Sequence, residues 1–254
     1  MIRMKMGLLA IGSLLLTTMT LLAPISAGAQ DEERSFSDIR TVRIKPSKYQ
    51  EFIELQTTFR DALQADDRPG RDVWQEVRGD VGVMHLVNRL DSLAELDEQW
   101  VPPLEEDAWA EWVEAINGTI DSSPRMILRR HPEYSIPSDE SSAPALLVLR
   151  YTTVAPGKSD AYHGWIENQL LPALKAGGAS GVSFAHVALG GDSNLWVTAT
   201  RVANWTEIDG PGQLPAISEE ERADLFAPYG DMVTKSEVRI LRCRADLSYA
   251  SADE

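Results

Sequence analysis

The pattern of apolar and polar positions in the first half of the chain predicts a mixed α+β unit. Residues 38–45 and 126–130 have the composition of strands, and residues 72–78 and 82–89 predict a hairpin that turns at Gly79-Asp80. Two further stretches carry apolar residues every three or four positions, as one side of a helix does. These helix positions are Tyr49, Phe52, Ile53, Phe59 and Leu63, then Trp109, Trp112, Val113, Ile116 and Ile120. The predicted order is β-α-β-β-α-β.

The second half of the chain predicts the same order of elements. Residues 146–154 and 238–244 have strand character, and residues 182–189 and 195–202 predict a second hairpin. The first helix is marked by the apolar residues Tyr162, Trp165, Ile166 and Leu170. A Ser-x-x-Glu capping box that begins at Ser218 predicts the start of the second helix.

Short segments recur between the two halves at a nearly constant distance. The segment starting at Tyr49 matches the one starting at Tyr162, and Ile127-Leu128-Arg129 matches Ile240-Leu241-Arg242, both at a shift of 113 residues. Gly79-Asp80 matches Gly191-Asp192 at a shift of 112, and Pro46-Ser47-Lys48 resembles Pro156-Gly157-Lys158 at a shift of 110. A constant shift across several matches indicates a tandem duplication.

The duplicated order of elements defines the fold that we expect. A βαββαβ unit is ferredoxin-like, and its four-stranded sheet has helices on one face only. The bare face needs a second sheet, which the other copy supplies. We therefore expect an α+β fold: two tandem ferredoxin-like units at 37–134 and 145–249, packed sheet to sheet as an intramolecular pseudo-dimeric α/β barrel. Residues 135–144 are expected to be a linker, because they are rich in Pro, Ser and acidic residues.

The openings of the two units resemble those of a known group of proteins. KPSKYQEFIEL (45–55) and APGKSDAYHGWIE (155–167) each place a Pro and a Lys before a helix. They are similar to NIPSNAP-like and antibiotic-biosynthesis-monooxygenase-like members of the dimeric α/β barrel superfamily. The resemblance covers nearly all of residues 37–247 and implies architecture. That superfamily includes cofactor-free oxygenases, haem enzymes, isomerases and proteins without known activity, so the resemblance transfers no reaction.

The beginning of the chain has the features of a secretory signal. Arg3 and Lys5 precede an uncharged, mostly apolar run over 8–25, and Ala27-Gly28-Ala29 matches a signal-peptidase site. We expect residues 1–29 to be a signal peptide, so that the mature protein is exported to the periplasm or the medium. A retained membrane anchor is the alternative, because the run is close to spanning length. No later segment is long and apolar enough to span a membrane.

Charge and cysteine content exclude several classes of function. The formal net charge is −15, and loss of Arg3 and Lys5 with the signal would make it more negative. A strongly acidic chain repels nucleic acid and anionic lipid surfaces, so we expect neither as a partner. Cys243 is the only cysteine and cannot form an internal disulfide. It lies in an apolar run and is expected to be a small core residue.

The four histidines do not predict a metal site. His85, His131, His163 and His186 include no pair with the spacing of metal ligands on a helix, and we expect neither a metal nor a resident cofactor. His186 is the candidate catalytic residue, because a histidine on a sheet face can act as a base. His186 or His85 could alternatively ligate haem, or serve as a hydrogen-bonded structural residue. His163 is expected to be exposed, and His131 carries no signal.

Tryptophan and arginine residues in the strands supply candidate ligand contacts. Trp74 and Trp196 lie on hairpin strands, where they either line a cavity or pack at the seam between the sheets. Arginine far outnumbers lysine, and many arginines fall in predicted strands, where charge is unusual. These side chains either form ion pairs with carboxylates or bind an anionic ligand in a cavity. Arg150 and Arg201 are the best candidates for binding, because each interrupts an apolar or Thr-rich strand.

The leading functional hypothesis is an exported protein that binds a small molecule in the cavity between its sheets, with no demonstrable catalysis, and an anion is one such ligand. Arg150, Trp196 and Arg201 are the predicted ligand-binding residues. The first alternative is a cofactor-free monooxygenase-like or related small-molecule enzyme, which requires His186, Trp196 and Arg150 to converge on a cavity. The second alternative is haem binding.

Overall fold

The computed structural model describes residues 35–97, 101–138, 145–209 and 217–250. The expected signal peptide, most of the expected linker and the last four residues lie outside this described part of the chain.

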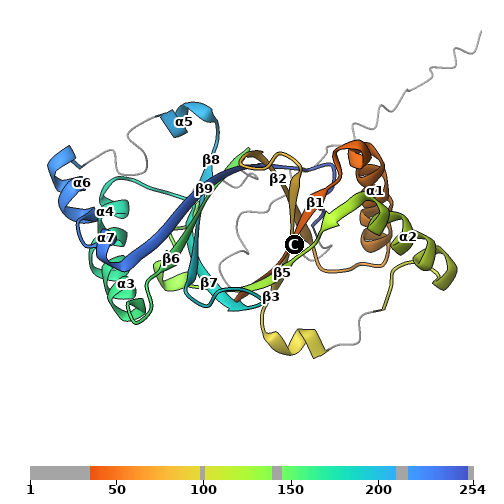
Figure 1. The fold of residues 1–254 in the computed structure, drawn as a ribbon, viewed down its shortest axis with the longest axis horizontal. Coiled ribbons are helices and arrows are strands. Elements are labelled where there is room, and N and C mark those ends of the chain that lie inside the picture. The colour runs from red at the N-terminus through yellow and green to blue at the C-terminus, as the bar shows by residue number, and fades with distance from the viewer. Residues whose placement is uncertain (1–34, 98–100, 139–144, 210–216, 251–254) are drawn as a thin grey trace, which may run out of the picture.

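Eight strands in the described part of the chain form a closed antiparallel barrel (Figure 1). Around the ring the order is β1 (Phe36–Ile44), β3 (Val83–Leu90), β2 (Arg71–Arg78), β9 (Val233–Cys243), β6 (Leu146–Val154), β8 (Leu195–Val202), β7 (Val182–Leu189) and β5 (Arg125–Arg130). Strand β5 pairs with β1 and closes the ring, and the short β4 (Ile120–Ser122) extends the pairing of β1. Closure pairs every strand of the ring on both sides, so the barrel has no free edge. The predicted α+β class is confirmed.

Helices cover the outer surface of the barrel on two opposite sides, so that they lie at the two ends of the long axis of the molecule (Figure 1). The first group contains α1 (Tyr49–Ala65) and α2 (Glu106–Thr119), which contact each other. The second group contains α3 (Ser159–Trp165), a π-helical turn (Ile166–Leu170), α4 (Leu171–Ala176), α6 (Glu219–Phe226) and α7 (Tyr229–Met232). Helix α5 (Trp205–Asp209) follows β8, and short 3₁₀ turns occupy Pro46–Lys48, Leu93–Asp97 and Pro132–Tyr134.

The two halves of the chain use the same strand order and meet at two equivalent seams. The order is β2-β3-β1-β5 in the first half and β7-β8-β6-β9 in the second. At the β2–β9 seam Glu76 lies opposite Leu241, and at the β7–β5 seam Val187 lies opposite Leu128. Each seam has a register shift directly beyond these pairs. The Ile-Leu-Arg segments that recur in the sequence are therefore the seam-forming parts of β5 and β9.

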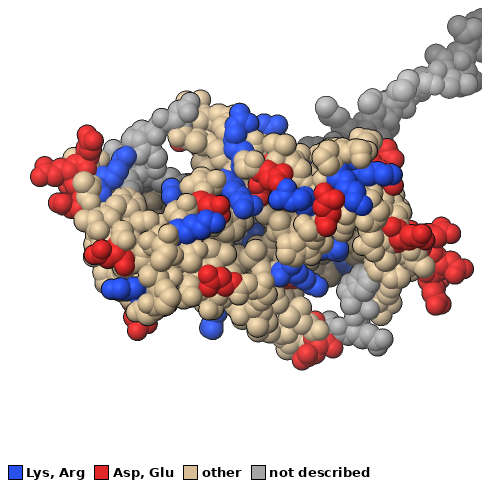
Figure 2. Space-filling model, in the orientation of Figure 1, with Lys and Arg blue, Asp and Glu red and all other residues tan. Residues whose placement is uncertain are grey.

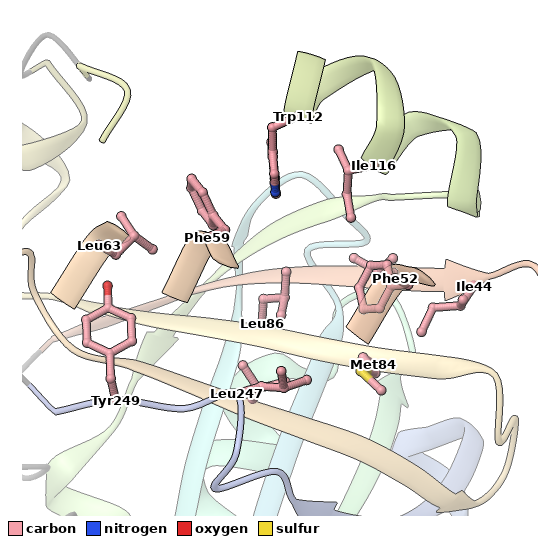
Figure 3. Packing of buried hydrophobic residues seen from close by; sticks show 12 residues of the cluster. Ile44, Phe52, Phe59, Leu63, Met84, Leu86, Trp112, Ile116, Leu247 and Tyr249 are labelled. Carbon is pink, nitrogen blue, oxygen red and sulfur yellow. The ribbon is translucent and has the colours of Figure 1, made fainter. Parts of the chain in front are cut away.

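Three apolar clusters hold these layers together. Figure 3 shows the first, in which Phe52 and Phe59 of α1 and Trp112 of α2 pack on the outer face of the first four strands. A second cluster packs α3, α4 and α7 on the outer face of the other four strands, around Trp165 and Phe184. The third lies inside the barrel. Both faces of most strands are therefore buried.

Most predicted elements form where the periodicity places them. Residues 146–154, 182–189 and 195–202 are strands over the predicted bounds, and Ser218 caps α6 through the predicted capping box. The closing strand β9 begins at Val233, earlier than the predicted residue 238. Its first residues are polar and exposed, and pairing with β6 holds them in the sheet.

Candidate functional site

The barrel encloses a cavity of about 120 Å³. Alternate residues of all eight strands face it, because side chains in a strand point to opposite faces in turn. Its middle is apolar, with walls that include Trp74, Val87, Leu128, Leu149 and Leu241. A cavity of similar volume, about 150 Å³, holds benzene in another protein. The space therefore suits a ligand about the size of one aromatic ring.

One end of the cavity carries positive charge. Arg89, Arg130 and Arg201 line it, and Asp72 is the carboxylate among the described lining residues. Arg89 forms an ion pair with Asp72, with 3.1 Å between the Nη2 and Oδ2 atoms. The lining thus has more cations than anions, although the whole chain has a net charge of −15.

Two of these arginines occupy corresponding places in the two halves. Arg89 of β3 lies opposite Ser37 of β1, and Arg201 of β8 lies opposite Leu147 of β6. Since β3 and β8 hold the same position in the strand order of their halves, both guanidinium groups belong to the same end of the barrel.

The other end of the cavity carries a buried hydrogen-bonded network. His85 lines the cavity, and its Nε2 atom lies 2.9 Å from Oε1 of Glu76, a residue with no exposed surface. The same carboxylate oxygen accepts a hydrogen bond from Nη1 of Arg239 at 2.7 Å. Nδ1 of His85 lies 3.1 Å from the Thr41 hydroxyl. The Arg239 guanidinium also stacks on the Tyr151 ring, 5.2 Å from its centroid.

Burial and charge set the protonation of this network. Burial works to raise the pKa of Glu76, but the hydrogen bonds from His85 and Arg239 outweigh it and lower the pKa below the usual value. Glu76 is therefore an anion. Burial raises the pKa of Tyr151 to about 12, so its hydroxyl keeps its proton at neutral pH and can donate a hydrogen bond into the cavity.

The structure places the four residues singled out from the sequence at three different locations. Arg201 lines the cavity. Trp196 and His186 lie side by side on the outer face of β7 and β8, with ring centroids 5.4 Å apart. Arg150 is exposed on the outer face of β6, where Nη1 donates to the Ser236 hydroxyl at 3.4 Å. His186, Trp196 and Arg150 do not converge on the barrel cavity.

A cluster of aromatic and titratable side chains surrounds His186 beneath α3. Nε2 of His131 lies 2.7 Å from Nδ1 of His186, and Nδ1 of His131 lies 2.8 Å from Oε1 of Glu133. His163 meets Trp196 edge-on at 4.6 Å between centroids, and Trp196 is only 3% exposed. The expectation that His163 is exposed is wrong, because α3 turns its ring against Trp196. No signal in the sequence pointed to His131, which directly follows β5. Its backbone N–H donates to the Phe184 carbonyl of β7 at 2.9 Å, and the residue is buried.

Hydrogen bonds and burial both act on the protonation of this cluster. The Glu133 carboxylate accepts from Nδ1 of His131, and Nε2 of His131 pairs with Nδ1 of His186. Burial, together with the neighbouring His131, His163 and Arg129, lowers the pKa of His186 to about 4. Burial and His131 also lower the pKa of His163. We conclude that His186 and His163 are neutral at pH 7.

Several residues in or beside the cavity were not singled out from the sequence. Glu76 of β2 and Arg239 of β9 form their hydrogen bond only because these two strands pair at a seam. Arg89 and Arg130 line the other end of the cavity. Cys243 lines the cavity, and burial, then Asp72, raises its thiol pKa. In the part of the chain that the structure describes, no group of three or more His, Cys, Asp or Glu side chains is arranged to hold a metal ion. None of the described helices is long and apolar enough to cross a membrane.

Comparison with known proteins supports the fold and leaves the activity open. No protein-family model matches the chain, and no curated protein matches it in sequence. An anthrone oxidase-like protein of known structure superposes with a TM-score of 0.60 at 12% identity, over 87% of this chain and 95% of its own. A candidate monooxygenase from Fusobacterium nucleatum superposes with a TM-score of 0.58 at 11% identity, over 85% of this chain and 98% of its own. A candidate chlorite dismutase, TA0507, superposes with a TM-score of 0.51 at 9% identity, over 84% of this chain and 96% of its own. These likenesses establish a fold of the dimeric α/β barrel type.

Proposed function

We propose that this protein binds a small organic anion, about one aromatic ring in size, inside its barrel. The observation that carries the proposal is the combination of an apolar cavity with three arginines at one end. Guanidinium groups bind carboxylates through paired, charge-assisted hydrogen bonds. An aromatic carboxylate would place its ring among Trp74, Leu128 and Leu241 and its charge at the arginine end.

The presence of arginines in this lining also favours a role in binding. Barrel interiors are usually filled by apolar side chains, so guanidinium groups in the lining are unusual. Arg89 and Arg201 occur at corresponding places in both halves, so the positive end is a repeated feature. Such an end attracts an anion despite the acidic surface, which Figure 2 shows over α6 and α2.

Calorimetric titration with benzoate and with benzamide tests this proposal. The two molecules have nearly the same shape and differ in charge, so we expect benzoate to bind at least tenfold more tightly. Arg201→Met should weaken benzoate binding by roughly 10- to 100-fold, because a hydrogen bond to a charged group contributes about 1.5–3 kcal/mol. Arg150→Met is the matched control and should leave the Kd unchanged, since Arg150 lies on the outer face. Equal binding of benzoate and benzamide would refute the proposal.

Because the fold resembles those of a candidate monooxygenase, an anthrone oxidase-like protein and a candidate chlorite dismutase, the competing functions are an oxygenase and a haem protein. A cavity of about 120 Å³ accommodates one ring and is small for a porphyrin. His186 is packed against His131 and Trp196, at 4.9 and 5.4 Å between centroids, so a haem there would have to displace these rings. The described residues therefore fit haem poorly. A Soret band on titration with haemin would reverse this conclusion, and oxygen uptake in the presence of bound aromatic carboxylates would support the oxygenase.

We also propose that the chain arose by duplication of one ferredoxin-like unit. The shared strand order and the matching registers of the two seams support this. Because each half covers the inner sheet face of the other, residues 35–138 or 145–250 expressed alone should aggregate or form homodimers. A stable monomer in sedimentation measurements would contradict the duplication model.

Export through the signal at residues 1–29 is part of the same proposal. The basic start, the apolar run and the Ala-Gly-Ala segment support it. N-terminal sequencing of the protein isolated from its source should find a first residue close to Gln30. An intact N-terminus in the mature protein would contradict cleavage.

A further inference from the structure

Tyr151 brings to the cavity a polar group that the surrounding protein does not use. It lies on β6 and lines the cavity together with Leu147 and Leu149, the alternate residues of the same strand face. In the part of the chain that the structure describes, the Tyr151 hydroxyl has no hydrogen-bond partner. Burial raises the pKa of this hydroxyl to about 12, so protein surrounds it. Its oxygen atom still has surface that a water-sized molecule can reach, and we conclude that the hydroxyl faces the cavity.

The two halves of the barrel differ at this position. By strand register, Tyr151 opposite Val197 corresponds to Thr41 opposite His85. The Thr41 hydroxyl lies 3.1 Å from Nδ1 of His85, so it has a partner on the neighbouring strand. The Val197 side chain has no polar atom. The register that satisfies one hydroxyl therefore leaves the other without a partner.

Residues of β9 hold the Tyr151 ring without bonding its hydroxyl. The Arg239 guanidinium lies over the ring, 5.2 Å from the centroid, and its Nη1 atom donates to Oε1 of Glu76 at 2.7 Å. Glu237 lies opposite Tyr151 in the strand register, but its Oε2 atom pairs with Nζ of Lys235 at 3.3 Å. The buried Glu76–Arg239 pair thus fixes one face of the ring and leaves the hydroxyl to a molecule in the cavity.

An unused hydroxyl at this place has an energetic consequence for binding. A buried polar group that makes no hydrogen bond destabilises a fold, and a phenylalanine would fill the same space without that cost. A ligand atom that accepts from the hydroxyl removes the cost, whereas an apolar ligand atom leaves it. A site built to hydrogen-bond a ligand group discriminates against the analogue that lacks it.

The hydroxyl also lies at a useful distance from the arginine end. Tyr151 is four residues along β6 from Leu147, which lies opposite Arg201. Their Cα atoms are therefore separated by about 13 Å along the strand. Because both ends line the same cavity, one aromatic ring fits between them.

We infer that Tyr151 selects ring-sized ligands that carry a hydrogen-bond acceptor, such as a carbonyl oxygen, by donating its hydroxyl proton to that atom. The inference deepens the proposed function and rests on its cavity, but it does not depend on the arginine end. Together with the proposed anion, it makes the ligand class an aromatic carboxylate with a second acceptor on the far side of the ring.

NMR titration with benzonitrile and with phenylacetylene tests this inference. These two neutral molecules have the same linear shape, and only benzonitrile has a strong acceptor atom. Tyr151→Phe keeps the ring and removes the hydroxyl, so it should weaken benzonitrile binding roughly 2- to 10-fold and leave the Kd for phenylacetylene unchanged. Tyr134→Phe is the matched control, because its hydroxyl lies on the outer face of the barrel, 3.3 Å from Nδ1 of His163. It should leave both Kd values unchanged.

The infrared spectrum of bound benzonitrile separates a hydrogen bond from a change in packing. A nitrile that accepts a hydrogen bond absorbs at higher wavenumber than one in an apolar site, so the band in the wild type should lie above the band in Tyr151→Phe. The same band in both proteins, an equal loss of affinity for both ligands, or absence of benzonitrile binding to the wild type would overturn the inference. Equal binding of benzoate and benzamide would instead overturn the proposed function, and a nitrile band that depends on Tyr151 would still support the inference.

Discussion

The clearest test of the histidine cluster is the loss of stability on acidification. The pKa of His186 falls from 6.5 to about 4 in the folded protein, because the ring is partly buried and lies beside His131, His163 and Arg129. Between these two pH values the unfolded chain binds a proton that the folded chain does not. The stability contributed by neutral His186 is therefore fully present above about pH 6.5 and is lost progressively as the pH falls to about 4.

The magnitude follows from the same two pKa values. Their difference corresponds to about 3.4 kcal/mol, and solvent screening of a half-buried ring reduces this to about 2 kcal/mol. Urea denaturation of the wild type and of His186→Gln at pH 7 and pH 4 measures it. Glutamine keeps a hydrogen-bonding side chain but does not titrate. Between the two pH values the wild type should lose about 2 kcal/mol more than the variant. Equal losses in both proteins would refute the assignment of a depressed pKa to His186.

Three further substitutions test the fold. Ser218→Ala removes the cap of α6 and should cost about 1 kcal/mol, measured by urea denaturation. Gly190→Ala should lower the melting temperature measurably, because Gly190 has φ +80° and an added Cβ would lie 2.5 Å from the Arg125 carbonyl oxygen. An unchanged melting temperature would contradict this backbone conformation. Leu128→Ala and Leu241→Ala, at the two equivalent seams, should each cost about 2–5 kcal/mol and differ little, so a large difference would argue against equivalent packing.

Local sequence patterns were sufficient to predict most of the secondary structure. The apolar stripe of α1, the hairpin from β7 to β8 and the capping box at Ser218 depend on residues a few positions apart, and each forms as predicted. The recurring Ile-Leu-Arg segments indicated a duplication, and the structure places them in the strands that meet at the seams. Such features are encoded locally and survive in any fold that buries the same stripe.

The candidate site was less predictable, because its residues are far apart in the chain. Arg201 was identified because it interrupts an apolar strand, and it lines the cavity. Arg150 was identified on the same ground, and it is exposed. Glu76 and Arg239 form one hydrogen bond across 163 positions, a relation that no local pattern encodes. His131 lacked any signal because its contacts come from β7, β8 and α3.

The sequence by itself determined which segments are helices and strands, in what order, and which strands alternate between two faces. Only the tertiary structure decided which of those faces is the inside of the barrel. Trp74 points into the cavity, whereas Trp196, also on a hairpin strand, points outward under the helices. The physical reason is that helices bury the outer faces of most strands while the cavity lining buries the inner ones. When both faces are apolar, alternation shows that two faces exist without showing which one will surround a ligand.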